Sequence, residues 1–208
     1  MEYYFDTSSL VALARYYHPF DKDGRLFEFV RNKFLNKEII VLDAILNETK
    51  LTSRGIALKA YPFMEEQKDL IVDTKELMPY STKKFGNMVD KNFAVAALVN
   101  NGKVNYSIIK QVFLNSGDGK LILTMYNRLH DDKEAEVCIV TEESKTGNDG
   151  KIFKKIPVLC EFIGAKCITL VDFLWDEVKG LTYQWGLAPV IGEENHEVLR
   201  AIRKVQAG

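Results

Sequence analysis

Acidic residues stand directly after apolar runs at several points of the chain, and such residues can bind a divalent metal. Asp6 follows the first run, and Asp43 follows a second run at residues 39–42. The full set comprises Asp6, Asp43, Glu48, Asp118, Glu142 and Glu143. Carboxylates that share one site repel each other unless a cation lies among them. Oxygen ligands without His or Cys favour Mg²⁺ or Mn²⁺ over Zn²⁺.

Short apolar runs rich in β-branched and aromatic residues predict the strands that would position these acids. Five strands are expected, at residues 3–5, 39–42, 70–72, 137–140 and 167–170, and residues 70–72 are the weakest candidate. Apolar residues at helical spacing predict helices between them, including one across residues 88–97. Acidic residues are expected at helix starts, as is Pro157, with Gly164 at the end of that helix.

Strands that alternate with helices predict an α/β fold. We expect a three-layer sandwich with a mostly parallel central sheet of about five strands, a helix-rich middle and a C-terminal helical extension. Ligands of open parallel sheets bind outside the carboxyl ends of the strands. Asp6, Glu142 and Glu143 follow strands, Glu48 lies one turn beyond Asp43, and Asp118 opens a helix just before the fourth strand. The acids should therefore converge on one edge of the sheet.

Each acid also has a purely structural interpretation. Asp6 and Asp118 could be helix caps, since aspartate is favoured at that position. Glu48 could be a solvated helix residue, and Glu142 and Glu143 could be loop charges. The recurrence of acids at successive strand ends favours a shared site over these separate interpretations.

The chain has 208 residues, which suits one domain, and its formal charge of −1 supplies no general attraction for nucleic acid. RNA binding would need a local basic patch, for which loop lysines at positions 145, 151, 154 and 155 are candidates, or a bridging metal. The three cysteines have no metal-ligand spacing and predict buried, reduced thiols. No signal peptide and no membrane-length apolar stretch is recognised, so a cytoplasmic protein is expected.

Four segments in order resemble the motifs of PIN domains. Residues 5–10 (FDTSSL) resemble the opening motif, in which a strand ends in Asp followed by hydroxyl residues. Residues 41–48 (VLDAILNE) resemble the second, residues 117–122 (GDGKLI) the third, and residues 138–143 (CIVTEE) the fourth. KIPVLC at residues 155–160 and GAKCI at 164–168 are similar to a PIN-like subgroup of bacterial and archaeal proteins.

This resemblance implies a ribonuclease that hydrolyses RNA phosphodiester bonds with Mg²⁺ or Mn²⁺. Asp6 would be the central metal ligand, Asp118 with Glu143 or Glu142 would complete the ligand set, and Glu48 would bind metal or orient water. The hydroxyls of Thr7, Ser8 and Thr141 would fix the carboxylates. The resemblance extends to toxins of toxin–antitoxin pairs, whose partners would be an antitoxin protein and a second copy of the chain.

A different class of function stays open, because a PIN-like fold can hold RNA or a protein without turnover. Other chemistries lack their motifs: there is no P-loop, no GxSxG and no GxGxxG. A haloacid dehalogenase phosphatase would need a second aspartate where the chain has Ser8.

We expect the tail to add a helix to the main domain. We predict a nuclease domain at residues 1–178 and an extension at 179–208 that packs on the same domain. The extension carries an apolar stripe and two aromatic anchors: Val198, Leu199, Ile202, Val205, Tyr183 and Trp185.

Overall fold

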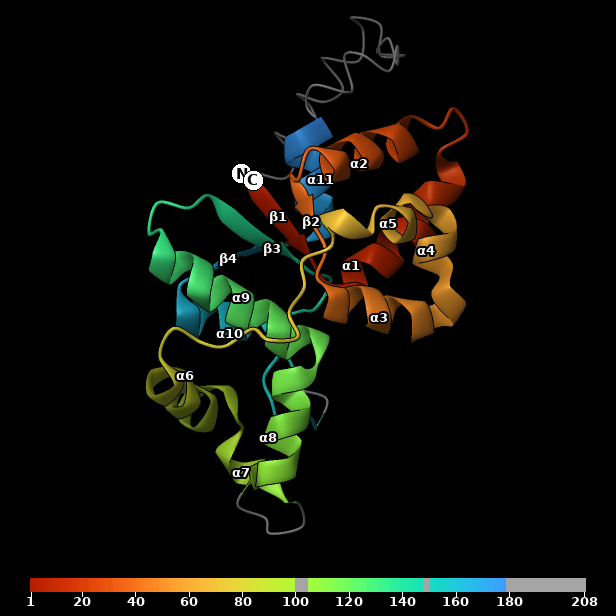
Figure 1. Ribbon diagram of the computed structural model, residues 1–208. Coiled ribbons are helices and arrows are strands. Elements are labelled where there is room, and N and C mark those ends of the chain that lie inside the picture. The colour runs from red at the N-terminus through yellow and green to blue at the C-terminus, as the bar shows by residue number, and fades with distance from the viewer. Residues whose placement is uncertain (100–104, 148–149, 179–208) are drawn as a thin grey trace, which may run out of the picture. The chain divides into compact units, whose positions relative to one another are not determined.

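A computed structural model describes residues 1–99, 105–147 and 150–178 of the chain (Figure 1). The chain divides into two compact units, Met1–Leu170 and Val171–Gly208. All the strands found in the described residues, and the candidate site, lie within the first unit. The predicted tail helix and its anchors lie outside the described residues.

The first unit is built on a four-stranded parallel sheet with the order β2-β1-β3-β4. The strands are β1 (Glu2–Phe5), β2 (Ile39–Ile40), β3 (Val137–Val140) and β4 (Lys166–Ile168). Phe5 pairs with Val140, and Val140 pairs with Ile168. Because the paired strands run in the same direction, the residues that follow Phe5 and Val140 emerge side by side.

The two central strands are buried along their whole apolar length. Tyr3, Tyr4 and Phe5 of β1 are buried, as is every residue of β3. Since successive side chains of a strand point to opposite faces, both faces of these strands are covered. This explains why both segments are continuous apolar runs rather than alternating ones.

The prediction of five strands was wrong by one. Residues 70–72 form only an isolated parallel bridge, in which Val72 pairs with Leu42. Val72 N–H donates to Val41 O and Asp43 N–H donates to Val72 O, at 3.0 and 2.9 Å. The preceding residues Lys68–Leu70 form a 3₁₀ turn, so too little extended chain is left for a strand.

Eleven α-helices are found among the described residues, and several are short. Their bounds are α1 Thr7–Ala12, α2 Arg25–Leu35, α3 Asp43–Leu51, α4 Ile56–Ala60, α5 Phe63–Glu66, α6 Thr82–Met88, α7 Ala96–Val99, α8 Tyr106–Asn115, α9 Gly117–Asp131, α10 Ile156–Ile163 and α11 Leu170–Val178. None of the helices in the described ranges is long and apolar enough to cross a membrane.

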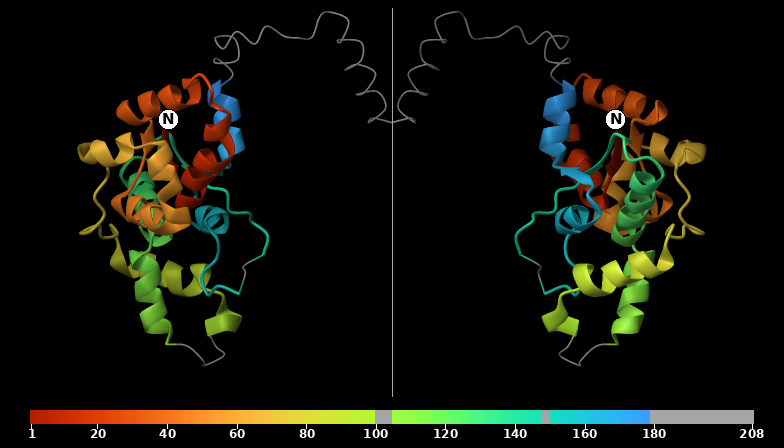
Figure 2. Two further views of the ribbon diagram at one scale, coloured as in Figure 1. Left: turned by 90° about the vertical axis from the view of Figure 1, so that its right-hand side faces the viewer. Right: turned by 90° about the vertical axis from the view of Figure 1, so that its left-hand side faces the viewer.

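Helices α3, α8 and α10 all pack against α9, and α10 also packs against β4. Helices α6, α7 and α8 lie together at the end of the first unit that is remote from α2 (Figures 1 and 2). Helix α9 therefore joins the sheet region to this second group of helices. Its first turn, where Asp118 lies, meets α3 on one side and the end of α8 on the other.

Several expected helix boundaries shift for identifiable reasons. The helix expected across residues 88–97 is interrupted, because Ala94 is extended and forms a bridge with Phe153. Asp118 is the second residue of α9, since the Ser116 hydroxyl caps this helix by accepting a hydrogen bond from Gly119 N–H. Residues 169–170 do not continue β4, and α11 begins at Leu170, before Asp172.

Candidate active site

Asp6 lies at the carboxyl end of β1 and caps α1. Its carboxylate oxygen Oδ2 accepts hydrogen bonds from Ser8 Oγ at 2.6 Å, Thr141 Oγ1 at 2.9 Å and Ser8 N at 3.3 Å. Only 4% of the residue is exposed. This burial raises the pKa of Asp6, although the hydrogen bonds from Ser8 and Thr141 act in the opposite direction. The sheet register produces this contact, because Thr141 follows the strand partner of Phe5.

Glu48 reaches the same region from α3. Its Oε1 accepts a hydrogen bond from the backbone N–H of Gly117 at 2.6 Å, and its Oε2 accepts one from Thr7 Oγ1 at 3.2 Å. The side chain thus links the first turns of α1 and α9. Glu48 is only partly exposed and contacts two other helices, so it is not simply a solvated helix residue.

Asp118 lies in the first turn of α9 and faces Asp6, Glu143 and Glu48. Its pKa is raised to about 7, first by burial and then by the negative charges of Asp6, Glu143 and Glu48, while Lys151 lowers it. Within the described ranges, the Asp118 carboxylate accepts no hydrogen bond. A carboxyl group in this position is stabilised by a proton or by a nearby cation.

The side chains of the adjacent residues Glu142 and Glu143 contact different elements, the start of α11 and the start of α10. Glu143 Oε2 accepts a hydrogen bond from Ile156 N at 2.8 Å, and its Oε1 lies 3.9 Å from Lys151 Nζ. Glu142 Oε1 instead accepts a hydrogen bond from Leu170 N–H at 2.7 Å, at the start of α11. The structure therefore brings Glu143 to Asp118, whereas Glu142 caps a helix.

The structure gathers four of the predicted site residues: Asp6, Glu48, Asp118 and Glu143 (the acidic cluster). It separates Asp43 from them, since Asp43 Oδ1 accepts hydrogen bonds from Ala44 N, Thr74 N and Thr74 Oγ1. Asp43 thus holds the segment around Thr74 against the start of α3. The cluster's members come from four different elements, which only the folded chain brings together.

The atoms of the acidic cluster that could bind a metal are all carboxylate oxygens, the ligand type that Mg²⁺ and Mn²⁺ prefer. As the side chains stand, no group of three or more His, Cys, Asp or Glu residues in the described part of the chain is arranged to hold a metal ion. Glu48 and Glu143 each bond a backbone N–H group instead. The chemistry of the cluster fits a divalent cation, and these two side chains are the ones whose bonds would compete with it.

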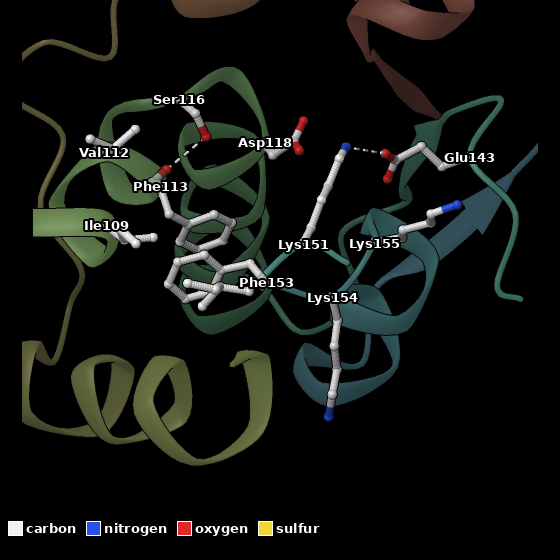
Figure 3. A pocket seen from close by; sticks show the side chains of 11 residues that line it. Ile109, Val112, Phe113, Ser116, Asp118, Glu143, Lys151, Phe153, Lys154 and Lys155 are labelled. Atoms are coloured by element: carbon white, nitrogen blue, oxygen red, sulfur yellow. Dashed lines mark hydrogen bonds and ion pairs between the residues drawn. The ribbon is translucent and has the colours of Figure 1, made fainter. Parts of the chain in front are cut away.

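A cavity of about 330 Å³ adjoins the acidic cluster at Asp118 and Glu143 (Figure 3). Its lining comes from α8, from the first turn of α9 and from the segment 151–155. Phe113 and Phe153 stack on each other in its wall, with ring centroids 4.1 Å apart. The sequence does not predict this cavity, because the apolar residues of α8 have the same pattern as ordinary core residues.

The loop lysines separate into different environments. Lys151 Nζ extends between Asp118 and Glu143 (Figure 3). Lys154 points away from the acids, with Nζ 4.6 Å from the ring centroid of Phe162. Lys145 forms an ion pair with Glu161 at 2.6 Å. Of these three lysines, only Lys151 lies beside the acidic cluster, and the fourth predicted lysine, Lys155, also lines the adjoining cavity (Figure 3).

Comparison with known proteins identifies one family. The family model described as "Domain of unknown function (DUF4411)" matches residues 3–179. No curated protein and no solved structure matches the chain. The matched residues include the whole acidic cluster and every residue that lines the adjoining cavity.

Proposed function

The chain belongs to this family, whose description assigns no function, and we propose from the site itself that it is a Mg²⁺- or Mn²⁺-dependent endoribonuclease with a PIN-like, three-layer α/β fold. The observation that carries the proposal is the position of Asp118. This acid faces Asp6, Glu48 and Glu143, and its pKa is raised to about 7. Crowded carboxylates repel each other in the folded protein, so the arrangement favours a site that receives positive charge.

The proposed metal ligands are Asp6, Asp118 and Glu143, with Glu48 either bound to metal or orienting the attacking water. A bound divalent metal would polarise the phosphate and lower the pKa of water. The protein supplies the orientation of the acids. Ser8 and Thr141 fix the carboxylate of Asp6, and Gly117 N–H fixes that of Glu48. Hydroxyl and backbone donors of this kind are typical of the groups that orient metal ligands.

RNA is the proposed substrate, and the local charge around the cluster supports an anionic ligand. The net charge of −1 gives no general attraction, so binding must depend on a few cations at the site. Lys151 Nζ lies 3.9 Å from Glu143 Oε1 and lowers the pKa of Asp118, so we expect it to contact a phosphate bound at these two acids. Hydrolysis would break one P–O ester bond of the backbone, and the attacking water would supply the oxygen that replaces it.

The role of a toxin in a toxin–antitoxin pair is the more specific form of this proposal. In that case an antitoxin protein would bind the chain and suppress RNA cleavage, and two copies of the chain would form a homodimer. Expression of the chain alone should then arrest bacterial growth, whereas Asp118→Asn should not. Normal growth with the wild-type chain, at matched protein levels, would contradict the toxin role but not the ribonuclease proposal.

A non-catalytic module that binds RNA or protein is the second candidate, and one observation favours it. The carboxylates of Glu48 and Glu143 already bond backbone N–H groups, as structural acids do. In such a module these acids would join helices, and Lys151 would neutralise the cluster without metal. This candidate predicts binding without turnover.

RNA cleavage by the full-length protein separates the two candidates. We expect Mn²⁺ or Mg²⁺ to activate cleavage of labelled single-stranded RNA, and Asp118→Asn to abolish it. Glu143→Gln should lower the rate strongly, whereas Glu142→Gln should leave it near wild type. Glu142 is the matched control because it is adjacent in sequence but faces Leu170. RNA that binds and stays intact with every metal tested would support the module instead.

A further inference from the structure

The cavity beside the acidic cluster has the features of a site for part of the RNA chain. We propose that it binds one unpaired nucleobase, on the nucleotide that adjoins the phosphate held at Asp118 and Glu143. This inference rests on the proposed ribonuclease function and adds the form of the substrate: the strand must be single-stranded at the cleaved position. A base that is paired in a duplex is stacked and cannot enter a side pocket.

The walls of the cavity suit the flat apolar face of a base. Phe113 and Phe153 are stacked and almost fully buried, so they form a rigid wall. Ile109 and Val112 line the cavity from α8. Bases bind proteins without sequence preference mainly through contacts of their π faces with apolar and aromatic side chains. The volume of about 330 Å³ is at the small end for ligand pockets, which fits a nucleotide-sized group rather than a helix.

The polar rim suits the phosphate that is attached to the base. Asp118 and Glu143 lie at one side of the cavity, and the ammonium group of Lys151 extends toward them (Figure 3). A phosphate placed there would contact the cation and lie beside the acids that act on it. A base could therefore lie against the apolar wall while the phosphate of the same nucleotide lies at the charged rim.

Two surface residues of α8 allow a controlled test. Val112 lines the cavity and is 65% exposed, and Ile108 is 60% exposed but does not line it. Val112→Glu should therefore fold normally and block the cavity with a charged side chain. Ile108→Glu places the same charge on the same helix, one turn away, and is the matched control for electrostatic repulsion of RNA.

The measurement uses the full-length protein and short single-stranded RNAs that carry one abasic nucleotide, moved stepwise along the strand. Anisotropy of fluorescent RNA without added metal gives affinity, and cleavage with Mn²⁺ gives the position of the cut. One abasic position, next to the cleaved bond, should weaken wild-type binding or cleavage about tenfold. Val112→Glu should show a similar loss with intact RNA and no further loss at that abasic position. Ile108→Glu should behave as wild type.

Two results would overturn the inference separately from the proposed function. If the wild-type protein cleaves RNA but no abasic position matters, the cavity holds no base, although the ribonuclease proposal stands. If one abasic position weakens RNA binding by the wild-type protein but not by Val112→Glu, and the RNA is never cleaved, the cavity proposal stands and the ribonuclease proposal fails. A protein that neither binds nor cleaves any of these RNAs overturns both.

Discussion

The carboxylate of Glu48 and the backbone of Gly117 are in direct contact, and the contact requires glycine. Glu48 Oε1 accepts a hydrogen bond from Gly117 N–H at 2.6 Å. A Cβ atom at position 117 would lie 2.5 Å from Glu48 Oε2 and 2.7 Å from Ile45 Cδ1. The glycine therefore lets α9 begin against α3, with Asp118 next to the glutamate.

The two glycines that flank Asp118 should respond differently to alanine. A Cβ at Gly119 would lie 2.0 Å from the backbone oxygen of Phe113, which cannot move without shifting α8. Gly119→Ala should therefore lower the free energy of unfolding by at least about 3 kcal/mol. Gly117→Ala meets mainly side chains that can rotate, so it should cost about 1 to 2 kcal/mol while displacing Glu48. Urea denaturation of both variants checks the order, and equal losses would contradict it.

Divalent metal should stabilise the protein through the acidic cluster. Because metal would bind only the folded site, Mg²⁺ or Mn²⁺ should raise the melting temperature by mass action. Asp6→Asn should remove most of this increase, and Glu143→Gln should reduce it. Glu142→Gln should retain it, since Glu142 faces the start of α11. Thermal melts with and without metal provide the measurement, and an unchanged wild-type melting temperature at millimolar metal would contradict the proposed site.

The metal-free protein should become more stable as the pH falls toward 6. The pKa of Asp118 is raised from 3.8 to about 7 in the folded protein. The folded state therefore binds more protons than the unfolded state between these values, and stability falls as the pH rises through this range. One group contributes at most about 1.4 kcal/mol per pH unit.

Denaturation in EDTA at several pH values tests this dependence. Asp118→Asn should flatten the profile between pH about 4 and 7 and should stabilise the metal-free protein at the upper end, because it removes a charge that the other acids repel. Identical profiles for the variant and the wild type would show that Asp118 does not carry the effect.

Sequence patterns predicted the elements that carry the acids because each is locally encoded. β1 and β3 are continuous apolar runs, and α10 begins next to Pro157 and ends before Gly164. The expected convergence of acids followed from one rule about the carboxyl ends of parallel strands. Four of the six acids that were singled out do lie together.

What the patterns could not predict depends on contacts between distant segments. The direction of Glu142 and Glu143 is decided by which backbone N–H group each meets, Leu170 or Ile156. Asp43 follows a strand as Asp6 does, but the segment around Thr74 covers it. The cavity requires Phe153 to meet α8, and neither segment's periodicity indicates this contact.

The buried hydroxyl of Thr141 should contribute more to the free energy of unfolding than the hydroxyl of an ordinary buried threonine. Thr141 is 1% exposed, and its Oγ1 donates to Asp6 at 2.9 Å. Thr141→Val keeps the shape but removes a donor to a buried carboxylate, so we expect a loss of about 1.5 to 3 kcal/mol at neutral pH. Thr124→Val is the control, because Thr124 is 7% exposed and its Oγ1 donates to Lys120 O in its own helix rather than to a carboxylate. Chemical denaturation should show a clearly smaller loss for Thr124→Val.

Lys151 should contribute to RNA binding more than Lys154, although both belong to one loop and line one cavity. Lys151 lies beside Glu143 and lowers the pKa of Asp118, whereas Lys154 extends over the ring of Phe162. Lys151→Gln should weaken binding of single-stranded RNA and reduce the salt dependence of the affinity by about one ion. Lys154→Gln makes the same change in net charge and should alter neither quantity strongly. Salt titrations of RNA affinity measure both effects, and equal losses in the two variants would mean that the loop acts only as a diffuse positive charge.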